Sequence, residues 1–327
     1  MANSQPMKKT IRIYFVDFWN GFDPGDNFFI NRLKIHYNVV LDEAHPELLF
    51  YSYNGIQHFR YDKSITIYFS GENDVPDFNL SDYAISFHPV QFEDRHLRLP
   101  LFVLYKCFPD LDKQKTSSSK ELLQRKFCAF VVSNSKGADR KREDFFHKLN
   151  EYKKVDSGGR YLNNTGSPVA DKLEFIKGYK FVIAFENSAA SGYTTEKLIE
   201  PLAVNSVPIY WGNPNVNKDF NSKSFVNAAD FKSLDELVQE IIRLDNDDDA
   251  YLSMAQEHPF TESQKKSADW INDFDEFMDS IIQQEPENAI RRTRFGYARF
   301  YTRRYKLLFG MANLPGIRYL VRKLSYR

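Results

Sequence analysis

The chain of 327 residues is long enough for two domains of ordinary size, and its 42% hydrophobic and 27% charged residues exclude a globally disordered protein. The formal net charge of zero hides an asymmetry: residues 286–327 contain 11 Lys and Arg against one Glu, which leaves 33 Lys and Arg against 43 Asp and Glu elsewhere. No apolar run reaches the ~20 residues of a membrane span, and the opening MANSQPMKKT lacks the pattern of a signal peptide.

Short apolar runs rich in β-branched and aromatic residues predict seven strands, which alternate with stretches of helical spacing. In chain order the predicted strands are 11–16, 47–53, 64–69, 83–87, 127–132, 180–185 and 207–211. The predicted helices are 139–149, 171–179, 195–204, 233–244 and 262–284. This alternation indicates an α/β protein with parallel sheets covered by helices.

A polar, Ser-rich segment at 109–126 has no apolar periodicity and predicts a domain boundary. We therefore expect an N-terminal α/β domain at 1–115, a C-terminal α/β domain at 116–285 and a basic aromatic tail at 286–327. Each of the two α/β segments has an ordinary domain size.

Three features argue against metal and phosphate-loop chemistry. Cys107 and Cys128 lie in apolar stretches, which predicts buried thiols and a cytosolic, reducing compartment. The acidic run 244–251, LDNDDDAY, lies between predicted helices, so we interpret it as a capping and turn cluster rather than a metal clamp. The SGG at 157–159 lacks the spacing of a dinucleotide loop.

The segment 181–197, FVIAFENSAASGYTTEK, predicts the end of a buried strand followed by the start of a helix. Helix starts at the carboxyl edge of a parallel sheet favour anions such as phosphate. Lys197 in the first helical turn is unfavourable for the helix dipole, so its position suggests a bound diphosphate, and Glu196 can then accept two sugar hydroxyls. The alternative is that Thr-Thr-Glu is ordinary helix-start chemistry and Lys197 points into solvent.

Residues 185–212, FENSAASGYTTEKLIEPLAVNSVPIYWG, resemble the signature of the α-1,3/4-fucosyltransferases, which reads FEN, a spacer, Y-x-TEK, an apolar helix and a VP-x-x-x-G ending. Segments 69–87, 155–166 and 213–231 are similar to further parts of that family, so the resemblance spans most of 60–285. It implies a GT-B fold, in which two Rossmann-like domains with parallel sheets face a central cleft.

The resemblance also implies the reaction: inverting transfer of L-fucose from GDP-β-L-fucose to the 3-OH or 4-OH of N-acetylglucosamine in a lactosamine-type glycan. No divalent metal would be obligatory, because Arg and Lys would hold the diphosphate. By motif, Glu72 in SGEN is the general base, and Glu186 either faces the fucosyl carbon or orients its loop. The residues implied to bind the donor are Arg142, Asn187, Tyr193, Glu196 and Lys197.

Each of these roles has a plainer alternative when the residues are considered without the family. Glu72 is then an exposed loop acid, Arg142 a charge on a helix surface and Asn187 a residue that bonds the backbone of its turn. Trp19, which follows the first predicted strand, either stacks on an acceptor sugar or packs in the core. Two other functions also fit the pattern, namely transfer from a different nucleotide sugar and non-catalytic glycan binding at a membrane.

The tail alternates arginines with aromatic residues between 289 and 309. On a helix, Tyr297, Tyr301, Tyr305 and Leu308 fall along one stripe, flanked by basic residues. A basic amphipathic helix is typical of a segment that lies on an anionic membrane. A second basic piece lies at 317–327. We expect peripheral attachment to the inner face of a bacterial membrane; packing on the acidic body and nucleic-acid binding are the alternatives, and we expect no nucleic-acid partner.

Overall fold

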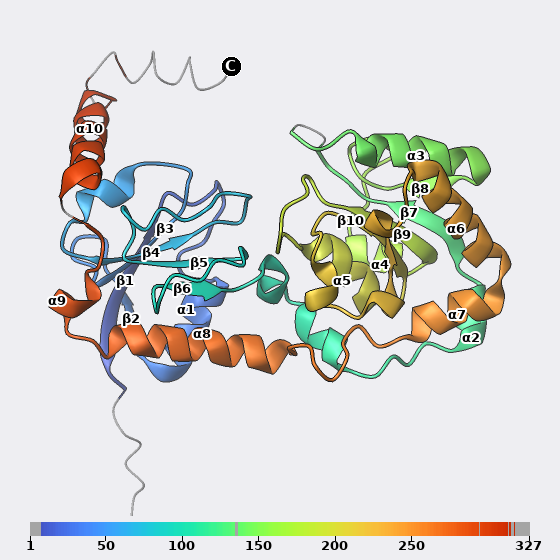
Figure 1. The fold of residues 1–327 in the computed structure, drawn as a ribbon, viewed down its shortest axis with the longest axis horizontal. Helices are drawn as coiled ribbons and strands as arrows, with labels where there is room; N and C mark the ends of the chain where they lie inside the picture. The colour runs from blue at the N-terminus through green and yellow to red at the C-terminus, as the bar shows by residue number, and fades with distance from the viewer. Residues whose placement is uncertain (1–7, 135–136, 294, 313, 315–316, 318–327) are drawn as a thin grey trace, which may run out of the picture. The chain divides into compact units, whose positions relative to one another are not determined.

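The computed structural model describes residues 8–134, 137–293, 295–312, 314 and 317, which form two compact units, each built on one parallel sheet (Figure 1). The first unit contains the chain up to Ser86, Val90–Arg98 and the chain from Asn272 onward. The second unit contains Phe87–Pro89 and Leu99–Ile271. The predicted α/β class is therefore confirmed.

The first unit has a six-stranded sheet with the order β2-β1-β3-β4-β5-β6, and all neighbouring strands are parallel. Its strands are β1 (Thr10–Val16), β2 (Asn38–Leu41), β3 (Leu48–Tyr51), β4 (Ile65–Phe69), β5 (Tyr83–Ser86) and β6 (His96–Arg98). Its helical elements in the described residues are α1 (Phe28–His36), the 3₁₀ turn η1 (Gln57–Arg60), α9 (Pro286–Ala289), α10 (Gly296–Ala312) and most of α8 (Ser267–Ile282).

The core of the first unit is largely aromatic. Phe29 of α1 packs against Phe50 of β3 and Phe69 of β4, with ring centroids 5.4 and 4.9 Å apart. Phe274 of α8 lies 6.0 Å from Phe29 and is fully buried. The returning segment 272–282 is thus part of this core.

The second unit has a five-stranded parallel sheet with the order β11-β10-β9-β7-β8. Its strands are β7 (Lys126–Phe130), β8 (Val155–Ser157), β9 (Tyr179–Phe185), β10 (Val207–Trp211) and β11 (Val226–Asn227). Its helices are α2 (Ser119–Leu123), α3 (Lys141–Tyr152), α4 (Lys172–Ile176), α5 (Glu196–Ala203), α6 (Leu234–Asn246) and α7 (Asp248–Gln256), with 3₁₀ turns η2 (Leu101–Leu104), η3 (Phe108–Asp112), η4 (Val216–Lys218), η5 (Ser222–Ser224) and η6 (Ala228–Asp230).

Both faces of the second sheet are covered, which explains why β9 is apolar along its length. Phe181 and Ile183 share one core with residues of α3, α6 and α7. Val182, which points the other way, packs with Ile176 of α4. The sheet therefore exposes only its ends, and its carboxyl end is free to carry polar chemistry.

The compact units do not divide at the expected boundaries of 115 and 285. Residues 99–115 pack with the second unit, because Phe102 and Phe108 bury their rings against Phe220 and Phe260. Residues 272–285 join the first unit through α8. The polar segment 109–126, which contains the end of η3 and the short helix α2, therefore belongs to the second unit and is not the point at which the chain leaves the first.

The start of the predicted tail is also part of the first unit. Asp82, whose side chain is completely buried, accepts hydrogen bonds from the backbone amides of Arg291 and Arg292 and from the Arg292 guanidinium. Tyr305 of α10 stacks on Phe59 of η1, with ring centroids 5.0 Å apart. The alternative of packing on the body thus holds for Arg291, Arg292 and Tyr305. Most of the second basic piece, 317–327, lies outside the described residues.

Two further expectations concern the cysteines and membrane spans. Cys107 and Cys128 are buried free thiols, as predicted. In the described part of the chain, no helix combines the length and apolar character needed to span a membrane.

Candidate functional site

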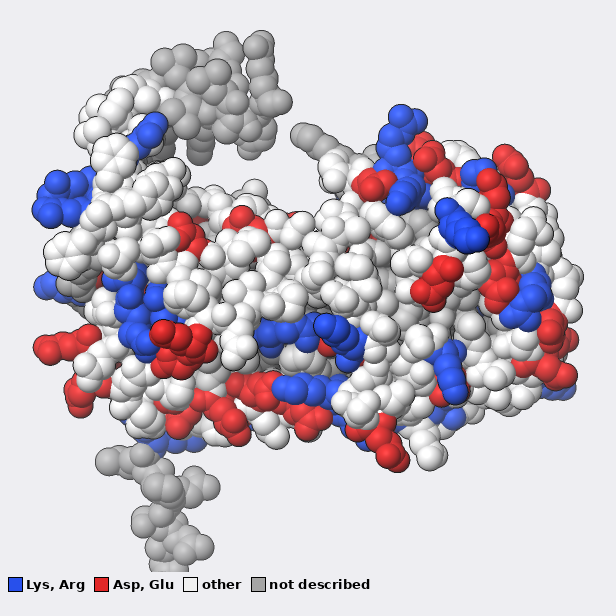
Figure 2. Space-filling model, viewed as in Figure 1, with Lys and Arg blue, Asp and Glu red and all other residues white. Residues whose placement is uncertain are grey.

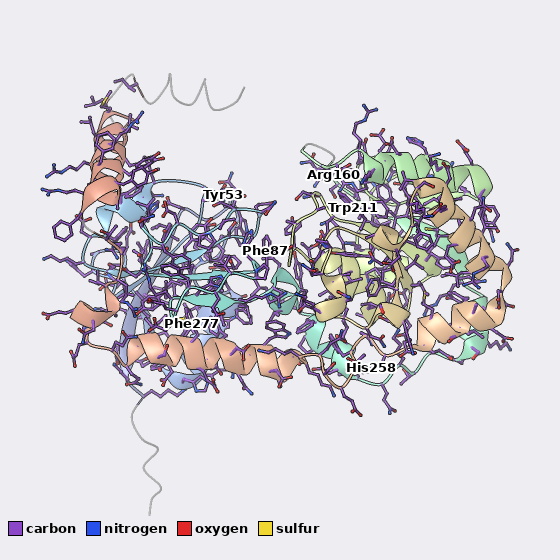
Figure 3. The ribbon with its side chains drawn as sticks, in the orientation of Figure 1. Tyr53, Phe87, Arg160, Trp211, His258 and Phe277 are labelled. Carbon is purple, nitrogen blue, oxygen red and sulfur yellow. The ribbon has the colours of Figure 1, made fainter. Side chains whose placement is uncertain are left out.

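The candidate site lies at the carboxyl edge of the second sheet, where polar residues follow three neighbouring strands and Trp211 ends a fourth. Glu186 and Asn187 follow β9, and the connection from β7 leads to Arg142 at the start of α3. Arg160 follows β8 and Trp211 ends β10, so both lie at the same end of the sheet (Figure 3). Parallel α/β sheets bind ligands at this edge.

Lys197 lies at the start of α5 and is paired with two carboxylates. Its Nζ is 3.1 Å from Oε2 of Glu186 and 3.3 Å from Oε1 of Glu196. Burial disfavours the ammonium, but the charges of Glu186 and Glu196 outweigh it and raise the pKa of Lys197 above its ordinary value. Lys197 is therefore a fixed cation, and its side chain is only 17% exposed. The alternative in which it points into solvent is wrong.

Glu186 is completely buried and is surrounded by donors. Its oxygens accept hydrogen bonds from the backbone amide and hydroxyl of Thr195, at 2.8 and 2.9 Å, and from Lys197. A Cβ on Gly212 would lie 2.5 Å from Cγ of Glu186, so a glycine is needed at that position. Burial raises the pKa of Glu186, and the charge of Lys197 opposes this rise.

These contacts bear on the two roles expected for Glu186. A carboxylate with no solvent exposure, which fixes Thr195 at the start of α5, orients the loop rather than presenting itself to a sugar carbon. It also forms an ion pair with Lys197 at the helix start, so the position of this lysine does not itself require a bound diphosphate. The pairing with Glu186 and Glu196 thus explains the position of Lys197, which the sequence pattern had attributed to a bound diphosphate.

Arg142 is 2% exposed and is therefore not a charge on the helix surface. Its guanidinium donates to Oδ1 of Asn187 at 3.0 Å and to the carbonyl of Asn134 at 2.9 Å. Burial lowers its pKa, although an arginine remains charged at neutral pH. Asn187 also accepts a hydrogen bond from the amide of Asp139 through its carbonyl. It thus has the backbone-bonding role named as its alternative and, in addition, holds Arg142.

Tyr193 is buried at the turn that precedes α5. Its ring centroid lies 5.1 Å from that of Phe87, and its carbonyl accepts a hydrogen bond from the hydroxyl of Tyr210. Gly192 beside it has a φ of 85°, and a Cβ there would lie 2.3 Å from the carbonyl oxygen of Phe87. The tyrosine therefore fixes the turn, and any contact of its ring with a donor remains a prediction.

Two residues that the sequence did not mark act on Glu196: Tyr105 through a hydrogen bond, and Lys172, whose ion-pair partner is Glu200, through its charge. The hydroxyl of Tyr105 donates to Oε2 of Glu196 at 2.8 Å, although 91 positions separate them. Burial opposes the ionisation of Glu196, but the charges of Lys197 and Lys172 outweigh it and lower the pKa of Glu196 to about 2. No local pattern marks Tyr105 or Lys172, because only the tertiary fold brings them to α5.

A third missed feature is an aromatic platform at the end of β10. Nζ of Lys141 lies 5.3 Å from the ring centroid of Trp211, a cation–π contact that places a second basic residue of α3 at this edge. The sequence could have indicated this platform, because Trp211 is an aromatic residue at the end of a predicted strand.

The remaining predicted residues lie at the carboxyl edge of the first sheet. Glu72 is exposed and follows β4, and Tyr53 follows β3 (Figure 3). Burial and then the charge of Glu72 raise the pKa of Tyr53. Trp19 follows β1 and is 46% exposed, so it does not pack in the core.

Comparison with known proteins decides the family. A model of the α-(1,3)-fucosyltransferase FucT N-terminal domain matches residues 13–105, and one of the glycosyltransferase family 10 (fucosyltransferase) C-terminal domain matches residues 122–278. The chain belongs to the family 10 fucosyltransferases. The two matches leave unassigned a gap that includes most of the polar segment 109–126.

Individual fucosyltransferases are similar to this chain over most of its fold. An α-(1,3)-fucosyltransferase of Helicobacter pylori is 37% identical over 231 residues, which are 61% of this chain and 48% of that relative. The chain thus spans about half the length of that protein. A crystal structure of an α1,3-fucosyltransferase with GDP is 30% identical, covers 87% of this chain and 93% of its own, and has a TM-score of 0.74. A second, with GDP-fucose, is 29% identical, covers 85% and 94% and has a TM-score of 0.71.

These fucosyltransferase structures confirm the GT-B class expected for the two α/β units. The acidic run 244–251 has the interpretation given from sequence: Asp247 caps α7, and Asp245 pairs with Lys153. Within the described residues, no group of three or more His, Cys, Asp or Glu is placed to hold a metal ion.

Proposed function

We propose that this chain transfers L-fucose from GDP-β-L-fucose, with inversion, to the 3-OH or 4-OH of N-acetylglucosamine in a lactosamine-type glycan. Membership of the family and the likeness to an α1,3-fucosyltransferase crystallised with GDP-fucose support the donor. The observation that carries the proposal is a pair of cations at one sheet edge, buried Arg142 and partly buried Lys197, which are held by the consecutive residues Asn187 and Glu186.

The proposed chemistry follows from these charges. The acceptor oxygen forms a bond to the anomeric carbon of fucose, the bond from that carbon to the β-phosphate oxygen breaks, and its electron pair leaves with GDP. Negative charge therefore grows on the diphosphate, where Arg142 and Lys197 stabilise it. Glu196 would accept hydroxyl groups of the donor, because Lys197, Lys172 and Tyr105 keep it ionised and oriented.

Glu72 would take the proton of the acceptor hydroxyl as the new bond forms. An exposed carboxylate at a strand end is accessible to an acceptor, and attack opposite the leaving group gives inversion. Trp19 would stack on a sugar ring of that acceptor, since its indole is exposed. Lewis-type and lipopolysaccharide glycans contain the N-acetylglucosamine unit that this reaction requires.

Transfer would need no obligatory divalent metal, because the cations of Arg142 and Lys197 meet the charge of the diphosphate. A chelator should then leave the rate of transfer unchanged, whereas a loss of more than about ten-fold that Mg²⁺ or Mn²⁺ restores would refute this part of the proposal.

Transfer assays separate this function from its alternatives. GDP-fucose with N-acetyllactosamine should give a fucosylated product, and UDP-glucose or GDP-mannose should not. Product from another nucleotide sugar alone would favour a different glycosyltransferase. Glycan binding without turnover of any donor would favour a non-catalytic protein.

We further propose that α10 lies on an anionic membrane at the cytoplasmic face of a bacterial cell. The side chains of Phe295, Phe300 and Leu307 are 77%, 63% and 66% exposed, which is unusual for such large apolar groups. Figure 2 shows Lys and Arg side chains over α10 and the loop that leads to it. Co-sedimentation with vesicles that contain phosphatidylglycerol tests this attachment, and equal binding to neutral vesicles would refute its electrostatic part.

A further inference from the structure

A cavity of about 290 Å³ lies in the first unit, where α10 and the loop before it meet η1 and the segment around Asn79. Four of its lining residues are cations and one is an acid: Arg292, Arg299, Arg303 and Lys306, with Asp62. Its volume is near the lower end of the ~300–1,000 Å³ of small-ligand sites. The excess of positive charge indicates an anionic ligand.

Two of these cations are already neutralised. Arg292 is paired with buried Asp82, and Lys306 is paired with Asp62. Arg299 and Arg303, by contrast, make no ion pair and no side-chain hydrogen bond to any part of the chain that the structure describes. They are four residues apart on α10, where like charges repel and destabilise a helix. An anion between them would remove that repulsion.

The opposite wall of the cavity is fixed before any ligand arrives. Asp17 has a φ of 62°, a strained value for a residue other than glycine, and its buried carboxylate lies 2.7 Å from Nδ1 of His58. The His58 ring stacks on Tyr51, with centroids 4.1 Å apart. Since Phe59 in turn stacks on Tyr305, the wall and α10 are held at a set spacing. A preformed site loses little entropy on binding.

The identity of the anion follows from its surroundings. Two arginine forks match the tetrahedral, multiply charged oxygen array of a phosphate better than a single carboxylate. The helix that carries them also exposes Phe300, Leu307 and Met311, which suit the interfacial region of a lipid layer. A phosphate that is attached to a lipid would satisfy both surfaces at once.

We propose that this cavity binds the phosphate of an anionic phospholipid headgroup between Arg299 and Arg303. The proposal rests on the membrane attachment of α10 proposed above and assigns it a specific site. It is independent of fucosyl transfer.

Arg304 provides a matched control, because it is the same residue type on the same helix and is exposed but does not line the cavity. Arg303→Gln and Arg299→Gln should each weaken binding to phosphatidylglycerol vesicles by roughly 10- to 100-fold, as expected for loss of a charged hydrogen bond. Arg304→Gln should weaken it only about five-fold, as expected for one basic residue near a charged surface. Equal losses of vesicle binding for Arg303→Gln and Arg304→Gln would refute phosphate binding in the cavity. They would leave the proposed attachment of α10 to the membrane intact.

A second measurement uses a soluble headgroup. Titration of glycerol 3-phosphate, followed by NMR of arginine side chains or by thermal unfolding, should give a saturable response that Arg303→Gln abolishes and Arg304→Gln retains. No response in wild type would overturn the site. A saturable response together with no vesicle binding would show a soluble phosphate as the ligand and overturn the lipid assignment. Failure of wild type to bind vesicles would by itself refute the attachment of α10, so the two proposals fail separately.

Discussion

Lys197 lies 3.1 Å from Glu186, a carboxylate that solvent does not reach, and so its charge serves both the fold and the proposed donor site. Removing one partner of a buried ion pair leaves an uncompensated charge. A simple substitution of Lys197 therefore cannot separate a loss of folding from a loss of donor binding.

A double variant can separate them. Lys197→Met should lower the free energy of unfolding by about 3–5 kcal/mol, because Glu186 is left buried and unpaired. Glu186→Gln with Lys197→Met should recover most of that stability and still bind GDP more weakly than wild type, by on the order of ten-fold or more. Urea unfolding and calorimetric titration with GDP measure the two effects. Wild-type affinity in the double variant would remove Lys197 from the donor site.

Arg142 should stabilise the transition state more than it stabilises the bound substrate. Arg142→Met should lower kcat by about 10²–10³-fold, as is typical when one preorganised contact to developing charge is removed. Asn187→Ala should give a smaller loss, since it removes only the side chain that holds the guanidinium at 3.0 Å. Steady-state kinetics with GDP-fucose provide the comparison.

Arg140 is the control for Arg142, because it is an exposed arginine at the start of the same helix. Arg140→Met should leave kcat within about two-fold of wild type, since isolated surface charges contribute little. A loss equal to that of Arg142→Met would mean that general positive charge, and not the buried guanidinium, matters.

Much of the fold could be predicted from the sequence, because its longer elements have strong local patterns. All seven predicted strands and all five predicted helices are present, although α8 begins at Ser267 rather than near 262. The missed strands β2, β6, β8 and β11 have two to four residues, too few for a periodicity to emerge. The boundaries of the two units differ from the expected ones. The packing of the segment 99–115 on the core of the second unit is a contact between distant parts of the chain, and no local sequence pattern indicates it.

In the candidate site, too, local features could be predicted and tertiary contacts could not. The position of Lys197 at a helix start was predictable, but its ion pair with Glu186 and the hydrogen bond from Tyr105 to Glu196 were not, because contacts across 11 and 91 positions depend on tertiary packing. The family signature marked Glu186 as important without indicating that it is buried. Burial is what distinguishes a residue that orients a loop from one that contacts a substrate.

Substitution of Glu72 should lower the rate of catalysis without changing the stability of the protein or its affinity for GDP. Glu72→Gln keeps the shape of an exposed side chain but cannot accept a proton, so kcat should fall by about 10²–10⁴-fold while the melting temperature is unchanged. GDP affinity should also be unchanged, because the proposed GDP contacts belong to the second unit. Glu276→Gln, which changes an exposed acid on α8 of the same unit, is the matched control. Near-normal transfer by Glu72→Gln would exclude Glu72 as the base.

Stability should depend on pH through Glu196. Its pKa is lowered from 4.5 to about 2 in the folded chain, so its stabilising contribution is present above pH 4.5 and is lost as the pH falls towards 2. The difference in unfolding free energy between wild type and Glu196→Gln should therefore be constant from pH 6 to 8 and shrink below pH 4.5. Urea unfolding across this range measures it. A difference that does not change with pH would show that Glu196 is not held by Lys197 and Lys172.

The boundary of the tail should be visible in truncated chains. A chain that ends at Thr293 keeps Arg291 and Arg292 on buried Asp82, and loses the packing of α10 on η1 and the ion pair between Lys306 and Asp62. A chain that ends at Asn288 leaves that carboxylate with Thr66 as its only remaining donor among the described residues, which should cost about 3–5 kcal/mol more and lower the melting temperature by roughly a further 6–12 °C. Thermal unfolding of both chains tests this difference. Equal melting temperatures would mean that Asp82 does not depend on the tail, and that residues 286–293 belong with α10 rather than with the first unit.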